Sequence, residues 1–354
     1  MQLLGFREVS SFQVAHGALP WPWIAFDPAH LRFAHAADAQ TIVVRSLVDG
    51  ALAETARFAL PEGLGLPQVA PDGYSSTARA KRLHAFALAP SGDELAITGI
   101  VDEGRSVVAT LGRGGELARA SVEERLGEGL FGQALSWDRT GAHLWIAAER
   151  DASPSAPARG DGVVARLDGA TLQVLGVVDH PEYPPPVAYE LALHPIDDAV
   201  LTLAACGQDG TFARVARFAD GRLQAIVTRL DGGGEPAGLV GFSPDGSRVF
   251  LAEESALRVH RWPALDLERT VDLGDEFMSA YSGAVVDDRV LVDGEDAEDG
   301  EDVVLAYDAS TLARVPPPTA IRGAMWVGRL QERHLVTVTP KGEPARGAVL
   351  RMLP

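Results

Sequence analysis

Short apolar runs alternate with turn-forming residues along most of the chain. The clearest example is residues 240–262, in which an apolar run ends at Gly241 and Phe242 and is followed by Ser-Pro-Asp-Gly at 243–246. A second apolar run at 248–252 and a third at 256–262 follow. Proline suits the second position of a type I turn and glycine its end. The pattern predicts three short antiparallel strands joined by tight turns.

This unit recurs along the chain about every 50 residues, close to the period of a β-propeller blade. Aligned on their first strands, seven units place a small residue at one position, followed each time by a large apolar residue. The small residues are Ala25, Ala87, Ser136, Ala192, Gly241, Ala284 and Ala324. Blades converge on an axis, so a small side chain on the innermost strand lets neighbouring sheets approach closely.

On these residues the chain resembles the WD-repeat and YVTN-repeat β-propellers. Phe-Ser-Pro-Asp-Gly at 242–246 carries the resemblance, with partial copies at 89–92 and 27–28. Two features depart from the pattern: no Trp-Asp pair closes a third strand, and units six and seven lack the Pro-Asp-Gly turn. The resemblance implies one all-β domain over 1–354, a seven-bladed propeller of four-stranded antiparallel blades. The blades are expected to begin near residues 24, 86, 135, 191, 240, 283 and 323.

The seventh unit has room for only three strands before the chain ends at Pro354. Residues 3–14 form an apolar-rich stretch that belongs to no unit of its own. We expect this stretch to supply the outer strand of blade seven, closing the ring and removing an open sheet edge.

Composition narrows the function classes. Lysine and arginine number 31 against 49 acidic residues, for a net charge of −18, which disfavours binding to nucleic acid. The single cysteine, Cys206, lies in an apolar run, so we expect a buried thiol and neither an internal disulfide nor a cysteine metal site. No basic start followed by a long apolar run is present, so the expected compartment is the cytoplasm, without membrane contact. No phosphate-loop motif indicates a cofactor.

Long connections are expected on one face. The loops that enter each blade and those that join its second and third strands lie together, on what we term the upper face; the other turns form the lower face. The long connections are 61–82, 150–161, 179–186 and 294–302. Function usually resides on such loops.

The acidic run at 295–302 lacks EF-hand ligand spacing, so it is interpreted as a solvated turn rather than a metal site. An acidic rim would suit a cationic partner, but simple turn chemistry is the preferred explanation of these residues.

Residues two or three positions before each small residue mark the upper mouth of the channel. The polar and aromatic candidates for a binding site there are Trp23, His84, Gln133, Tyr189, Glu190, Tyr281 and Arg322. They indicate either a small-molecule or peptide site or, alternatively, hydration of the mouth with hydrogen bonds between blades.

Two functions therefore stay open. The first is a non-catalytic propeller that binds a protein or peptide through its upper face, alone or as a subunit of a larger complex. The second is hydrolysis at the channel mouth, since the chain is similar in blade count to phosphogluconolactonase-like lactonases. By position only, His84, Glu190 and Arg322 would supply the base and the cation that such a reaction needs. Neither function predicts a bound metal or cofactor.

Overall fold

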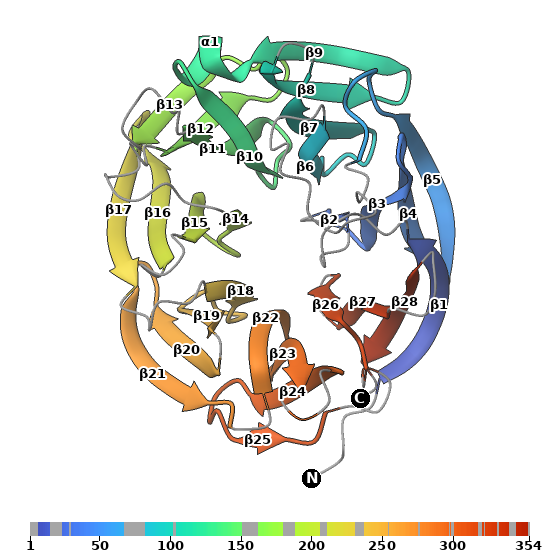
Figure 1. The fold of residues 1–354 in the computed structure, drawn as a ribbon, viewed down its shortest axis with the longest axis vertical. Helices are drawn as coiled ribbons and strands as arrows, with labels where there is room; N and C mark the ends of the chain where they lie inside the picture. Colours follow the sequence, from blue (N-terminus) through green and yellow to red (C-terminus); the bar gives the residue numbers. More distant parts are fainter. Residues whose placement is uncertain are drawn as a thin grey trace.

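Seven four-stranded antiparallel sheets form a closed ring in the computed structural model (Figure 1). The described residues are 6–14, 23–27, 30–66, 82–101, 104–150, 162–179, 188–205, 211–230, 237–253, 255–274, 277–296, 298, 301–317, 321, 323–330, 333–339 and 345–352. The predicted seven-bladed β-propeller is confirmed. Cys206 and Arg322, as well as most of the connections at 61–82, 150–161 and 179–186, lie outside the described residues.

Each blade runs from an inner to an outer strand. Blades one to three are β2 (Ile24–Phe26), β3 (Arg32–Asp38), β4 (Thr41–Val48) and β5 (Ala51–Ala59); β6 (Arg82–Leu88), β7 (Glu94–Ile100), β8 (Ser106–Gly112) and β9 (Gly115–Ser121); and β10 (Leu130–Trp137), β11 (His143–Arg150), β12 (Gly162–Asp168) and β13 (Val174–Asp179). Blades four and five are β14 (Ala188–Leu193), β15 (Ala199–Ala205), β16 (Thr211–Ala219) and β17 (Arg222–Leu230); and β18 (Ala237–Phe242), β19 (Arg248–Glu253), β20 (Ala256–Arg261) and β21 (Asp266–Asp272). Blades six and seven are β22 (Phe277–Val286), β23 (Arg289–Asp296), β24 (Asp302–Asp308) and β25 (Arg314–Val315); and β26 (Trp326–Arg329), β27 (His334–Thr339), β28 (Ala345–Met352) and β1 (Phe6–Val14).

The ring closes as the sequence predicts. Strand β1 pairs antiparallel with β28, from Phe6 opposite Met352 to Val14 opposite Ala345, and is the outer strand of blade seven. The two ends of the chain therefore meet in one sheet (Figure 1). Strand β28, which would otherwise be a sheet edge, has a partner on each side.

The core is divided into slabs between blades. Buried apolar side chains of the described strands fall into seven clusters, one between each pair of neighbouring blades. The small residue of each inner strand permits this packing. A Cβ atom on Gly241 would lie 3.2 Å from Cγ2 of Val285 in the next blade. Sheets this close leave little room for a larger side chain there.

Blade seven has a different register from the one its sequence suggests. In blade five the N–H of Ser243, two residues after Gly241, bonds to the carbonyl of Arg248; in blade seven the equivalent bond joins Leu330 to His334. The small residue of blade seven is therefore Gly328, not Ala324. A Cβ atom at Gly328 would lie 2.8 Å from the ring of Phe26 in blade one, so only glycine fits without displacement.

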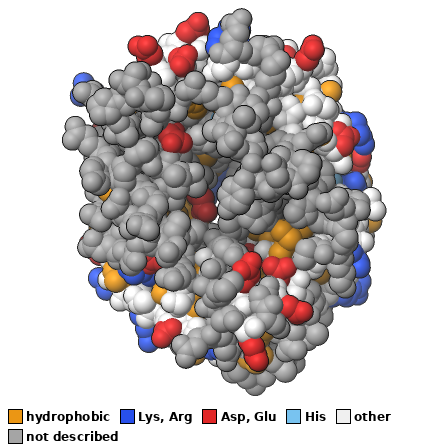
Figure 2. Space-filling view, in the orientation of Figure 1, with side chains coloured by type: hydrophobic (Ala, Val, Ile, Leu, Met, Phe, Trp, Pro, Cys, Tyr) orange, Lys and Arg blue, Asp and Glu red, His pale blue; other side chains and the backbone are white. Residues whose placement is uncertain are grey.

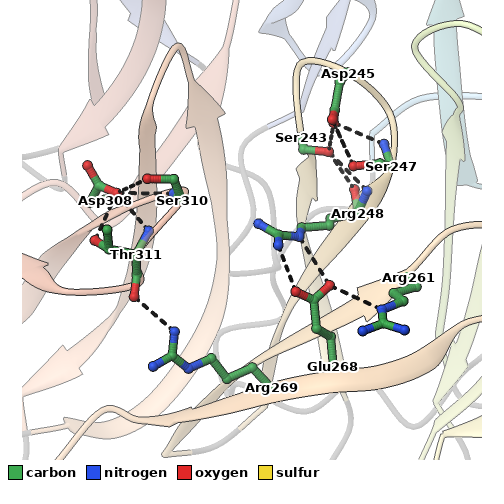
Figure 3. A network of polar contacts seen from close by, with 10 residues as sticks. All are labelled: Ser243, Asp245, Ser247, Arg248, Arg261, Glu268, Arg269, Asp308, Ser310 and Thr311. Carbon is green, nitrogen blue, oxygen red and sulfur yellow. Dashed lines mark hydrogen bonds and ion pairs between the residues drawn. The ribbon is translucent and has the colours of Figure 1, made fainter.

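Hydrogen-bonded turns fill the lower face. The Asp245 carboxylate accepts bonds from the Ser243 hydroxyl at 2.6 Å and the Ser247 N–H at 3.1 Å, and Asp308 caps its own turn in the same way (Figure 3). Side chains also join neighbouring turns: His194 Nε2 donates to the Gly246 carbonyl at 2.8 Å. The lower turns thus bond both internally and to one another.

The one helix in the described part of the chain, α1 (Val122–Leu126), connects β9 to β10 and has five residues. No helix among the described residues is long and apolar enough to cross a membrane.

Candidate functional site

The predicted mouth residues do lie on the inner strands or just before them. His84, Gln133 and Glu190 are in the upper parts of β6, β10 and β14, and Trp23 immediately precedes β2. The side chains of Tyr189 and Tyr281 and all of Arg322 lie outside the described residues. The register of blade seven places Met325 and Trp326, rather than Ile321 and Arg322, at the level of the other candidates.

His84 lies in a β-bulge of β6 and contacts the next blade. Its Nδ1 is 2.9 Å from the carbonyl oxygen of Gly132 on β10. The N–H of the same glycine donates to the Ser106 hydroxyl of blade two at 3.1 Å. Both backbone groups of Gly132 are thereby bonded to blade two. A bulge re-aims a side chain without ending the strand, which explains how His84 reaches across.

Gln133 and Trp23 also make defined contacts. Gln133 lies in a bulge of β10, and its amide nitrogen donates to the Glu149 carboxylate of the adjacent strand at 3.0 Å. Trp23 stacks on Phe86 of blade two, with ring centroids 6.2 Å apart and planes inclined by 16°. The Trp23 contact joins blades one and two, whereas the Gln133 bond lies within blade three.

Glu190 is the exposed acidic group of the upper channel. Its Oε2 accepts a hydrogen bond from the N–H of Leu239 in the next blade at 2.7 Å. The residue is exposed, and its strand β14 lies on the inner side of the ring (Figure 1). Desolvation by the surrounding protein raises the pKa of Glu190 to about 7, and the negative charge of Asp293 adds to the shift.

Asp293 on β23 is a second acidic group, fully buried, which the sequence interpretation missed. Its carboxylate accepts bonds from the N–H and hydroxyl of Ser282 and from the N–H of Val327 in blade seven, all near 3.0 Å. Burial raises the pKa of Asp293 to about 7 in spite of these bonds. A sequence signal exists: Asp293 follows the apolar run 290–292 in a strand whose middle residues are all buried.

More acidic residues continue upward from Asp293. Figure 2 shows carboxylate side chains over the blade of β22 to β25, which carries Glu295, Asp296, Glu298, Glu301 and Asp302. Partial burial raises the pKa of Asp302, and Glu295 and Glu301 add to the shift. Within the described ranges, no group of three or more His, Cys, Asp or Glu side chains is arranged to hold a metal ion.

Below this acidic level, the channel contains a cavity of about 450 Å³. Its walls are the last residues of six inner strands and are apolar except for Ser136 and Arg329. The lining residues are Ile24, Ala25, Phe26, Phe86, Ala87, Leu88, Leu135, Ser136, Trp137, Leu191, Ala192, Leu193, Leu239, Gly241, Phe242 and Arg329. A volume of this size is within the usual range for a small-molecule site.

Of the three residues that hydrolysis would use, the structure describes His84 and Glu190 but not Arg322. His84 and Glu190 belong to blades two and four, and the hydrogen bond described for each ends on the backbone of the following blade. Those bonds correspond to the inter-blade interpretation of the mouth residues. No family model matches the chain, and no curated protein shows significant sequence similarity to it. The repeat-family resemblance therefore rests on the fold and the turn motif.

Proposed function

We propose that the protein is a non-catalytic binding propeller whose upper channel mouth holds a cationic segment of a protein or peptide. One observation carries this proposal: Glu190 and Asp293 repel one another, and neither forms an ion pair with any described residue. A Lys or Arg side chain at the mouth would relieve that repulsion and lower both pKa values.

The acidic group on blade six extends this field. Glu295, Asp296 and Asp302 lie above Asp293 on the same two strands, so a basic segment would meet negative charge along its path toward the channel. Complementary charge of this kind speeds association and selects partners. It also makes nucleic acid an unfavourable ligand.

Binding is favoured over hydrolysis by the positions of the polar groups. His84 and Glu190, two of the three residues that a lactonase-like site would use, each bond to the backbone of the following blade. A general base must be free to reach its substrate proton. Their contacts suit residues that hold blades together, and a hydrolase remains the alternative.

The test compares two sets of charge removals in the full chain. The upper variant is Glu190→Gln with Asp296→Asn and Asp302→Asn. The lower variant, Asp49→Asn with Asp220→Asn and Asp266→Asn, removes as many charges from the opposite face. Asn tolerates the left-handed conformation at Asp49 and Asp220. The measurement is affinity purification with quantitative mass spectrometry.

We expect a basic partner to be recovered with the wild type and the lower variant and to be depleted at least about tenfold with the upper variant. A stoichiometric partner would identify the protein as a subunit of a complex. Equal depletion with both variants would overturn the proposal. Turnover of a lactone that is abolished by His84→Gln would instead establish the hydrolase.

A further inference from the structure

Arg329 departs from a sequence pattern that the other six blades share. The position after the small residue of each inner strand carries a large apolar side chain in six blades: Phe26, Leu88, Trp137, Leu193, Phe242 and Val285. In blade seven, where Arg329 follows Gly328, the same position carries a guanidinium group. Departures from a local pattern concentrate at functional sites.

The exception lies at the cavity described above. Arg329 lines the same cavity as Phe26, Leu88 and Phe242, its counterparts from the other blades, and it is the only charged residue among the lining residues described above. Arg329 is exposed. The cavity thus has one cationic group and one hydroxyl, that of Ser136, on an apolar wall.

The channel is also polarised from end to end. Glu190 bonds to Leu239, which lines the cavity, so this carboxylate marks the upper boundary of the apolar space. Arg329 is the last residue of its inner strand and lies toward the lower face. An anion would be repelled at the upper end of the cavity and attracted at the lower end.

We propose that the lower half of the channel binds a small amphipathic carboxylate, with its apolar body against the inner strands and its carboxylate on Arg329. Guanidinium binds carboxylate through two parallel hydrogen bonds, which gives orientation as well as affinity. The apolar walls contribute by removing hydrocarbon surface from water. This site is separate from the upper mouth and does not depend on a cationic partner there.

The experiment measures binding of three probes to the full chain by titration calorimetry: octanoate, 1-octanol and octylamine. They share one apolar chain and differ in head group. We expect the wild type to prefer octanoate over 1-octanol by about tenfold, as for a charge-assisted hydrogen bond, and octylamine to bind most weakly. Arg329→Leu, which places a large apolar residue there as in the other blades, should abolish the preference for octanoate. Arg329→Lys should keep part of that preference.

Two controls separate the site from general effects. Arg113→Leu removes an exposed arginine of the lower face that lies outside the cavity and should leave the preference unchanged. Ala192→Phe fills the cavity from its wall and should weaken octanoate and 1-octanol alike. Circular dichroism melting curves verify that each variant is folded.

The same titration identifies the source of the carboxylate. A short leucine-rich peptide with a free carboxyl terminus, compared with its amidated form, tests whether the end of a chain can take the place of a free acid. Equal affinity of the wild type for octanoate and 1-octanol, or no binding of either, would overturn the proposal. Loss of the preference in Arg113→Leu as fully as in Arg329→Leu would do so too.

Discussion

The pKa values of carboxylates at the two ends of the blades are shifted in opposite directions. In the lower turns, hydrogen bonds from Ser243 and Ser247 lower the pKa of Asp245 to about 2, and bonds from Ser310 and Thr311 depress the pKa of Asp308 further. At the upper end, desolvation raises the pKa of Glu190 and that of the buried Asp293 to about 7. The lower aspartates stabilise the fold when ionised, whereas the upper acids destabilise it.

This difference separates the scaffold from the site. In two lower turns, of blades five and six, the aspartate carboxylate is bonded within its own turn, as Figure 3 shows. At the upper end, ionisation of Glu190 and Asp293 is unfavourable in the isolated protein, and a bound cation would make it more favourable. A perturbed acid such as Glu190, exposed on an inner strand of the ring, is typical of a functional site.

The largest expected effect compares one tryptophan at each end of the channel. Trp137, at the lower end of β10, is 2% exposed, and its Nε1 donates to the Ala87 carbonyl at 3.2 Å. Trp23, at the upper end, is only partly buried, and its Nε1 has no hydrogen-bond partner among the described residues. Trp137→Ala should lower the free energy of unfolding by about 3 to 5 kcal/mol and Trp23→Ala by about half as much, measured by urea denaturation. Equal losses would contradict the proposed difference between the ends.

The next effect is a dependence of stability on pH that originates at the upper end. Between the ordinary value of 3.8 and the folded value of about 7, folded Asp293 keeps a proton that the unfolded chain releases. Its contribution is therefore fully present below pH 3.8 and is lost as the pH rises through about 7. Denaturation of the wild type should show a loss of stability over this window, to which Asp293 contributes on the order of 4 kcal/mol. Glu190 contributes as well, because its pKa is raised to the same value. Asp293→Asn should remove the share of Asp293.

Asp245→Asn is the matched control for that titration. The pKa of Asp245 is lowered to about 2, so this carboxylate contributes stability above pH 3.8 and loses it as the pH falls through about 2. The substitution should therefore change how stability depends on pH only at acidic pH, below about 4, and leave the dependence near neutral pH (the neutral limb) as in the wild type. If Asp293→Asn left the neutral limb as steep as in the wild type, the assignment of that limb to Asp293 would be wrong.

The sequence predicts the scaffold well because the scaffold is repetitive. Six of the seven small residues occupy the expected level, and the closing strand β1 pairs where the missing fourth strand of blade seven required it. Blade seven fails because Ala324 and Met325 imitate the small-large pair, and no Pro-Asp-Gly turn marks the true one at Gly328. Only the hydrogen bond from Leu330 to His334 identifies the correct register.

The site is less predictable because it consists of exceptions to the repeat. The alignment correctly placed His84 and Glu190 on the inner strands, but whether such residues bind a ligand or the next blade depends on bulges and distances across an interface. Arg329 was hidden by the wrong register. Asp293 was visible as a charge beside an apolar run, yet its bond to Val327 links residues 34 positions apart and has no local signal.

The smallest expected effect concerns Gln133, the upper polar residue that contacts its own blade. Its amide donates to Glu149 on the adjacent strand, a part-buried bond within blade three that crosses no interface. Gln133→Ala should therefore change the free energy of unfolding by less than about 0.5 kcal/mol in urea denaturation. Because Glu149 keeps its charge, the variant should also leave partner recovery unchanged. A loss as large as that of Trp23→Ala would mean that the bond to Glu149 stabilises blade three, and Gln133 would then belong to the scaffold.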